Sequence, residues 1–130
     1  MLYHVTRSQE AATFANEQSF GTEDLRQIAL KICDLPKLSG RRSRICVVTT
    51  GDGPVIVAEN GVVKEFPVAV LTREQLVDTN GAGDAFTGGF LAQYIQGRPL
   101  DVCIKCGIWT ATEIVQRSGC TYEGKVTFTF

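Results

Sequence analysis

Apolar residues recur along the chain with spacings typical of helices in some segments and of strands in others. The clearest helical pattern follows Gly21, where apolar residues repeat at i, i+3, i+4 and i+7 and so share one face of a helix. Thr22 is the expected N-cap of this helix, and Asp34–Pro36 is its expected end. The apolar face consists of Leu25, Ile28, Ala29 and Ile32.

Strand patterns occupy the middle of the chain. Ile45–Thr50 is apolar over most of its length, as in a strand buried on both faces of a parallel sheet. Val55–Glu59 and Val62–Val70 flank Asn60-Gly61, the strongest two-residue signal for a β-hairpin. These segments predict an α/β chain with an appended antiparallel hairpin. Weaker strand patterns lie at Leu2–Val5 and Lys125–Phe130.

Three further helices are expected. The first covers Gln9–Gln18, and the last lies between Pro99, which suits a helix start, and Gly119, which suits a helix end. Between these two, the helix Ala82–Gln96 stops before Gly97. It contains two adjacent glycines that lower its helix propensity by ~1 kcal/mol each relative to Ala, and we expect them to let the helix pack closely on the sheet. They are Gly88 and Gly89.

Composition excludes several classes of protein. The chain has 130 residues, 44% of them hydrophobic, and a net charge of −1, which suits one small domain or part of a larger one. It has no basic field for nucleic acid or an anionic membrane, no run near the ~18 apolar residues of a transmembrane helix, and no signal-peptide pattern at Met1–His4. We expect a cytoplasmic protein, with the nucleus left open as a second location, and neither nucleic acid nor membrane as a partner.

The cysteines carry no sign of a disulfide framework. There are five, an odd number, and they are scattered along the chain. Cys103-x-x-Cys106 is the only close pair, and it lies in a helical pattern without a second pair or a neighbouring His that would complete a zinc site. We interpret these two as core thiols one helical turn apart.

Candidate chemistry concentrates where the helix Ala82–Gln96 begins. Three small residues, Gly81, Ala82 and Gly83, lead directly into Asp84. Small residues let a ligand approach the backbone closely, and the free amides and dipole at a helix N-terminus suit an anion such as phosphate. The same dipole favours the ionised form of Asp84. An anion-holding loop and a carboxylate that can accept a proton therefore share one turn.

Two better-known glycine motifs do not fit this stretch. Gly83 and Gly88 have the outer spacing of a P-loop, but Gly89 and Phe90 follow where Lys and Ser or Thr are required. Gly81-x-Gly83 could begin a dinucleotide-binding fingerprint, but its sixth position is Phe86 instead of Gly or Ala. An ordinary glycine-rich helix start is the remaining alternative, although such a cap does not require Asp84 directly after three small residues.

The stretch Asp78–Phe90 resembles the second signature of the ribokinase-like (PfkB) carbohydrate and nucleoside kinases. Glu10–Ala15, Leu76–Gly81 and Gln116–Tyr122 resemble the corresponding segments of eukaryotic adenosine kinases, and the resemblance extends over about Ser8–Lys125. It implies a ribokinase-like fold, which is a Rossmann-like three-layer α/β arrangement, of which this chain would supply the C-terminal part of a mostly parallel sheet.

The resemblance also implies a reaction, in which ATP and adenosine give ADP and AMP in purine salvage. Asp84 would be the general base that takes the proton from the 5′-hydroxyl of adenosine. Gly81, Ala82 and Gly83 would form the anion hole for the transferring γ-phosphoryl group. Positioning, charge stabilisation and Mg²⁺ carry most of the work in phosphoryl transfer.

Further site residues follow from the resemblance alone. Thr50, Gly51 and Asn80 would belong to the ATP-binding region. The family has an Asn-x-x-Glu motif linked to Mg²⁺ and phosphate organisation, and it would fall at Arg7–Glu10. Glu10 matches and would act indirectly on Mg²⁺, whereas Arg7 replaces the Asn.

The family's members are much longer than this chain. We therefore expect residues 1–130 to be one partial kinase domain, the C-terminal ATP-binding part, without the N-terminal portion and lid that provide most nucleoside contacts. Two alternatives stay open: a sugar kinase of the same family, and a truncated nucleotide-binding remnant without catalysis. We expect the isolated chain to have little activity and to self-associate, because half of an open sheet leaves an unpaired edge.

Overall fold

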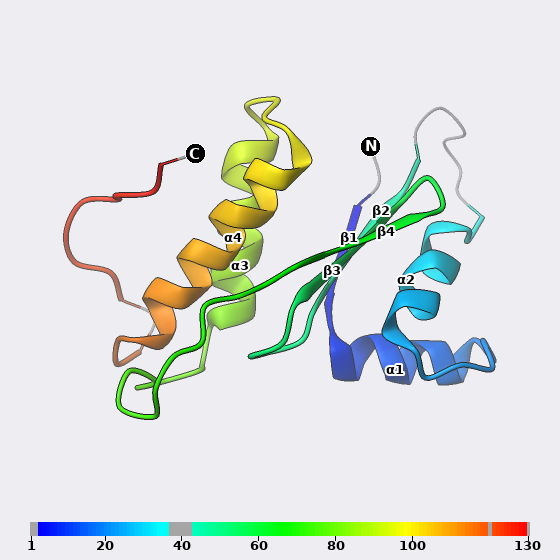
Figure 1. Ribbon diagram of the computed structural model, residues 1–130, viewed down its shortest axis with the longest axis horizontal. Helices are drawn as coiled ribbons and strands as arrows, with labels where there is room; N and C mark the ends of the chain where they lie inside the picture. Colours follow the sequence, from blue (N-terminus) through cyan, green and yellow to red (C-terminus); the bar gives the residue numbers. More distant parts are fainter. Residues whose placement is uncertain (1–2, 37–42, 120, 130) are drawn as a thin grey trace. The chain divides into compact units, whose positions relative to one another are not determined.

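A computed structural model describes residues 3–36, 43–119 and 121–129. The chain divides into two compact units, Met1–Val68 and Ala69–Phe130. The first unit holds a sheet with two helices, and the second holds a pair of helices (Figure 1). In chain order the elements are β1 (Tyr3–Arg7), α1 (Ser8–Glu17), α2 (Leu25–Cys33), β2 (Ile45–Thr49), β3 (Val55–Glu59), β4 (Val62–Phe66), α3 (Ala82–Tyr94) and α4 (Leu100–Val115).

The sheet of the first unit has the strand order β1-β2-β3-β4. β1 pairs with β2 in parallel, and the pairs β2–β3 and β3–β4 are antiparallel. The sheet is therefore mixed, which differs from the mostly parallel sheet expected for this part of the chain. The reason is that β2, β3 and β4 are joined by short turns, and strands joined in this way pair antiparallel. The expected strand at Leu2–Val5 is β1, although Leu2 lies outside the described residues.

The core of the first unit lies between the sheet and the two helices that precede β2. The apolar face predicted for α2 is confirmed, because Ile28, Ala29 and Ile32 are buried. They pack with alternate residues of the central strands, since successive side chains of a strand point to opposite faces. The full cluster is Ala11, Ala15, Ile28, Ala29, Ile32, Cys46, Val48, Ile56 and Ala58.

The predicted start of α2 is wrong by two residues. The N-cap is Asp24, whose carboxylate accepts a hydrogen bond from the Arg26 N–H at 2.9 Å. Thr22 lies two residues before this N-cap, and its hydroxyl oxygen accepts a hydrogen bond from the Asp24 N–H at 3.2 Å. Both residue types are good N-caps, so the sequence contains two N-cap residues that are two positions apart, and the structure uses the later one.

The predicted hairpin is confirmed. Asn60 and Gly61 have φ of 52° and 76°, which is the pair of positive values that a two-residue type I′ turn requires. β4 ends at Phe66, before the expected end at Val70. Pro67 follows directly, and a proline has no N–H to contribute to the ladder.

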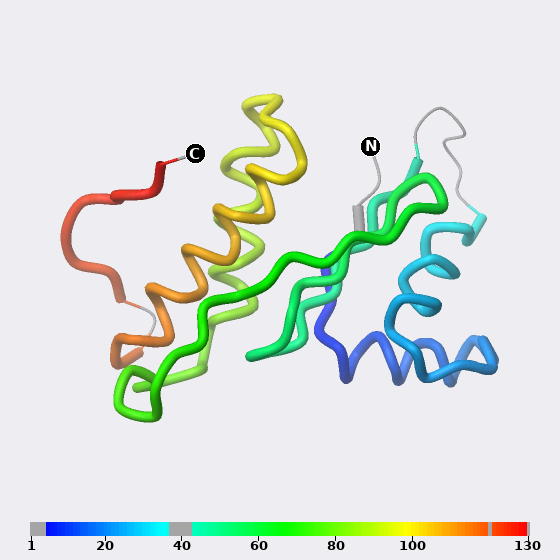
Figure 2. Tube along the Cα trace, viewed as in Figure 1, coloured from blue at the N-terminus to red at the C-terminus, as the bar shows by residue number. Residues whose placement is uncertain are grey.

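The second unit consists of α3 and α4, which lie side by side and are joined by a short turn (Figure 2). Gly97 has φ of 73° and terminates the first helix as expected. Phe86 and Phe90 are buried between the helices, as are Cys103 and Cys106, so the two cysteines are core thiols. None of the described helices combines the length and apolar character that a membrane crossing requires.

Gly89 provides close helix packing, but its partner differs from the one predicted. A Cβ at Gly89 would lie 2.3 Å from Oγ1 of Thr110 and 2.7 Å from the carbonyl oxygen of Cys106, both on α4. The partner is thus a second helix. A Cβ at Gly88 would meet no described atom within 4 Å, so Gly88 is not required for packing within the described residues.

The strand expected at Lys125–Phe130 is wrong for the described residues 125–129, which have no regular structure; Phe130 lies outside them. Instead of pairing as a strand, the C-terminal residues contact α4 through aromatic side chains. The Trp109 ring of α4 lies 6.4 Å from that of Tyr122 and 6.0 Å from that of Phe128, measured between ring centroids. No described strand pairs with the segment, and unpaired backbone in extended form gains no ladder hydrogen bonds.

Candidate functional site

The N-terminus of α3 begins at a glycine that the backbone geometry requires. Gly81 is the N-cap, with φ of 79° and ψ of 0°, a left-handed conformation that costs a residue with a Cβ roughly 1–2 kcal/mol. Its carbonyl oxygen accepts the first helical hydrogen bond, from the Ala85 N–H at 2.9 Å. The left-handed turn thus starts the helix abruptly, so the loop before it ends directly at the free amides of the first turn.

Gly83 and Asp84 are exposed in that first turn. A Cβ at Gly83 would have no described atom within 4 Å, so the backbone there is open to a ligand. Within the described part of the chain, the Asp84 carboxylate has no hydrogen bond or ion pair. A carboxylate without a protein partner, beside open amides at the positive end of a helix dipole, can accept a proton from a molecule bound over the turn.

The side chain of Asp78 forms two hydrogen bonds that hold the loop before Gly81 in place. One oxygen of this carboxylate, Oδ1, accepts from the Asn80 N–H at 2.9 Å, and Oδ2 accepts from the Gly119 N–H at 3.1 Å. These two hydrogen bonds, in that order of importance, lower the pKa of Asp78 below its ordinary value. The structure therefore brings Asn80, Gly81, Ala82, Gly83 and Asp84 together in one loop–helix junction of the second unit.

Thr50 and Gly51 belong to the first unit, in the turn that follows β2. The Thr50 hydroxyl donates to the Pro54 carbonyl oxygen at 2.8 Å, and the Gly53 N–H donates to the Thr50 carbonyl oxygen at 3.3 Å. Gly51 is exposed and has φ of 73°. The assignment of these two residues to an ATP-binding region stays a prediction.

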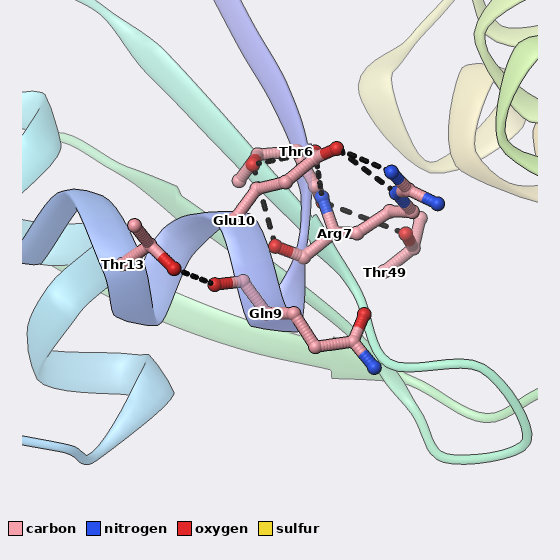
Figure 3. A network of polar contacts seen from close by, with 6 residues as sticks. All are labelled: Thr6, Arg7, Gln9, Glu10, Thr13 and Thr49. Atoms are coloured by element: carbon pink, nitrogen blue, oxygen red, sulfur yellow. Dashed lines mark hydrogen bonds and ion pairs between the residues drawn. The ribbon is translucent and has the colours of Figure 1, made fainter.

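Glu10 lies in the first turn of α1 and is held by the residues just before the helix (Figure 3). Its Oε1 accepts from the Arg7 guanidinium at 2.6 Å and 3.0 Å, from Nη2 and Nε respectively. Its Oε2 accepts from the Arg7 N–H at 3.2 Å and the Thr6 hydroxyl at 3.4 Å. The Arg7 side chain is the largest cause of a lowered pKa of Glu10.

The indirect role of Glu10 toward Mg²⁺ stays a prediction. Both Glu10 oxygens already have donors, so direct coordination of Mg²⁺ would have to displace Arg7. Over residues 3–36, 43–119 and 121–129, no group of three or more His, Cys, Asp or Glu side chains is arranged to hold a metal ion. In this arrangement the hydrogen bonds of Glu10 connect the first turn of α1 to the end of β1.

Comparison with known proteins assigns the chain to a family. The model of the pfkB family of carbohydrate kinases matches residues 5–126. The chain belongs to this family. Adenosine kinase 1 of Arabidopsis thaliana is 48% identical over 128 residues, which are 98% of this chain and 37% of that protein. The chain therefore spans little more than a third of the length of this pfkB relative.

Solved structures agree with the fold. The adenosine kinase of Anopheles gambiae, solved in complex with a diadenosine tetraphosphate, matches with a TM-score of 0.92 and 56% identity over 97% of this chain and 38% of that one. Ribokinase from Thermotoga maritima matches with a TM-score of 0.74 and 26% identity over 91% of this chain and 37% of that one. The fold of this pfkB-family chain is therefore ribokinase-like, as expected, and the chain holds a part of the full domain.

Sequence reasoning had assigned no individual role to Asp78. The local signal was present, because an Asp side chain often accepts from the backbone N–H two residues later, as it does here with Asn80. The second bond, to Gly119, spans 41 positions of the sequence. No pattern within Asp78–Phe90 could have predicted it.

Proposed function

We propose that this chain carries the phosphoryl-transfer machinery of an ATP-dependent nucleoside kinase, which converts ATP and adenosine to ADP and AMP in purine salvage. The observation that carries the proposal is the start of α3. There an exposed carboxylate, Asp84, which has no hydrogen bond or ion pair among the described residues, directly follows Gly83, whose backbone is open to a ligand. Membership of the pfkB family supports the reaction class.

Asp84 is proposed as the general base. A base must be ionised and within hydrogen-bonding reach of the proton that it takes. Asp84 lies in the first turn of α3, where its carboxylate is exposed to a molecule bound over that turn. The carboxylate would accept the proton of the 5′-hydroxyl as the oxygen of that hydroxyl attacks the γ-phosphorus of ATP.

The backbone around Gly81, Ala82 and Gly83 is proposed as the anion hole. Phosphoryl transfer places negative charge on the oxygens of the transferring group, and fixed N–H dipoles stabilise that charge without having to reorganise. The left-handed conformation of Gly81 fixes where these amides point. Mg²⁺ is proposed as the counter-ion of the ATP phosphates, and Glu10 is proposed to act on it indirectly.

Adenosine is the proposed acceptor because two kinds of observation favour it over a sugar. The segments Glu10–Ala15 and Gln116–Tyr122, outside the glycine stretch, resemble adenosine kinases. The named adenosine kinases also share more sequence with this chain, 48% and 56%, than the 26% shared by the ribokinase. Thr50, Gly51 and Asn80 are proposed as part of the ATP-binding region on the same grounds.

The test separates nucleotide binding from chemistry. Titration of the ¹⁵N-labelled chain with ATP should shift the amide signals of Gly81–Asp84, and the labelled γ-phosphoryl group of ATP should be transferred to adenosine, giving AMP and ADP, and not to ribose. Asp84→Asn should keep the ATP-induced shifts and reduce the small adenosine-dependent phosphoryl transfer expected of this chain to the adenosine-free background, since a general base usually contributes about 10²–10⁴-fold. Asp101→Asn is the matched control, because Asp101 is an exposed first-turn acid of α4. Equal turnover in Asp84→Asn and the unaltered chain would refute the base assignment, and absence of shifts at Gly81–Asp84 would refute the anion hole.

A further inference from the structure

We infer that Asp78 is a positioning residue, which holds the proposed anion hole in its active shape by linking it to the end of α4. This inference deepens the proposed function and rests on it. Asp78 itself is three residues before Gly81 and touches neither Gly83 nor Asp84 in the structure. Its effect on the site would therefore pass through the loop backbone.

Asp78 closes a local turn just before the anion hole. Oδ1 of Asp78 accepts from the Asn80 N–H at 2.9 Å, which closes a turn two residues long. The chain then reaches Gly81, and the Ala82 N–H donates back to the Thr79 carbonyl oxygen at 3.4 Å. Asp78 thus fixes the direction in which the backbone enters the left-handed residue that starts α3.

The link to α4 uses three hydrogen bonds. The Val77 and Asp78 N–H groups both donate to the carbonyl oxygen of Val115, the last residue of α4, at 2.8 Å and 3.1 Å. Oδ2 of Asp78 accepts from the Gly119 N–H at 3.1 Å. A carbonyl at a helix C-terminus has no intrahelical donor, so the loop before the anion hole provides the donors that this helix end lacks.

The side-chain bond to Gly119 differs from the two backbone bonds. A change of side chain removes it without removing a backbone N–H, and it is made to a charged acceptor, which is stronger than a bond between neutral groups. Half-burial of Asp78 shields it in part from water. Asp78 therefore connects the segment after α4 with the turn in which Asp84 lies, although the two are 35 positions apart in sequence (Gly119 and Asp84).

Asp78→Asn is the informative variant. The amide oxygen of Asn can still accept from the Asn80 N–H, but its NH₂ group would face the Gly119 N–H, so two donors would oppose each other. The variant keeps the local turn and loses the link to Gly119. Asp101→Asn again serves as control, since it removes a carboxylate from the same unit without touching this loop.

The experiment is ATP titration of the ¹⁵N-labelled chain, its variants and the control, with thermal unfolding measured in parallel. In the unaltered chain, ATP should shift Gly81–Asp84 and also Gly119, because the link transmits the change. Asp78→Asn should abolish the shift at Gly119 and weaken ATP binding about 10-fold, the change expected when one hydrogen bond to a charged group is coupled to binding. Asp78→Glu, which keeps the carboxylate, should restore part of the affinity.

The outcomes distinguish this inference from the proposed function. If ATP shifts no signal of Gly81–Asp84 in the unaltered chain, the proposed anion hole fails. If ATP shifts those signals equally in the unaltered chain and in Asp78→Asn, the anion hole stands and the positioning role of Asp78 is refuted. A fall in ATP affinity that merely parallels a fall in melting temperature, with Gly119 still responding to ATP, would assign Asp78 to stability alone and overturn the inference.

Discussion

Gly88 and Gly89 are adjacent in α3 but should respond in opposite ways to the same substitution. A Cβ at Gly89 would lie 2.3 Å from Oγ1 of Thr110 and 2.7 Å from the carbonyl oxygen of Cys106. The carbonyl belongs to the backbone of α4, and the Thr110 hydroxyl is held by donating to that same oxygen at 2.8 Å. Neither atom can move aside easily, so Gly89→Ala must push the two helices apart.

The magnitudes decide the sign of each effect. Ala is favoured over Gly in a helix by ~1 kcal/mol, whereas forcing extra atoms into a packed interface costs roughly 1–3 kcal/mol. Because the contact is with rigid backbone, the cost for Gly89→Ala should lie toward the upper end of this roughly 1–3 kcal/mol range. After the propensity gain is subtracted, the free energy of unfolding should fall by about 1–2 kcal/mol. Gly88→Ala meets no described atom and should gain up to ~1 kcal/mol.

Urea denaturation followed by far-ultraviolet circular dichroism measures both variants against the unaltered chain. The two should differ by about 2–3 kcal/mol, with Gly88→Ala the more stable, because the propensity gain is common to both and only Gly89 meets a steric conflict. Equal stability of the two variants would show that the close contact between α3 and α4 does not exist in solution, and a more stable Gly89→Ala would refute the packing argument outright.

Two predictions concern the first unit. Arg7→Gln should raise the pKa of Glu10 toward its ordinary value, since the Arg7 side chain is the largest cause of the lowering, while Arg26→Gln, which removes a different ion pair, should leave it unchanged; carboxyl ¹³C signals followed against pH would show this. Because the folded-state pKa is the lower one, the Glu10 contribution to stability is present above the unfolded-state pKa and is lost as pH falls through the folded-state value. Burial raises the pKa of the Cys46 thiol to about 12, so iodoacetamide at pH 8 should alkylate Cys46 only after denaturation, as measured by mass spectrometry; rapid alkylation in the native state would contradict its burial.

Local features of the fold could be predicted from the sequence because neighbouring residues determine them. The turn at Asn60-Gly61 needs two residues that tolerate positive φ, and the sequence places them between two apolar runs. The helix stop at Gly97 and the abrupt start at Gly81 follow from the same physical property. For the candidate site, the sequence predicted a helix from Ala82 with Asp84 at its start, but not the left-handed conformation of Gly81, and the roles of these residues stay predictions.

Features that depend on distant partners could not be predicted. The apolar strand Ile45–Thr49 suited a parallel sheet, but its pairing on one side is antiparallel because of the turn that happens to follow it. Lys125–Phe130 has a strand-like alternation, yet no described strand pairs with its residues 125–129, and the sequence does not say which edge is available. The bond from Asp78 to Gly119 is of the same kind.

Gly107 of α4 is a second glycine at which α3 and α4 are in close contact. A Cβ there would lie 2.8–3.0 Å from the Phe86 ring of α3, just as a Cβ at Gly89 would strike Thr110 and Cys106 of α4. Each helix thus has a glycine against which a group of the other helix packs. Gly89 of α3 faces Thr110 of α4, and Gly107 of α4 faces Phe86 of α3. Sliding one helix along the other by a single turn, about 5.4 Å, would take Phe86 away from Gly107, and Thr110 away from Gly89. The two glycines therefore favour the present axial alignment of the helices. Gly107 thus helps to fix the axial position of α3, whose first turn contains Asp84.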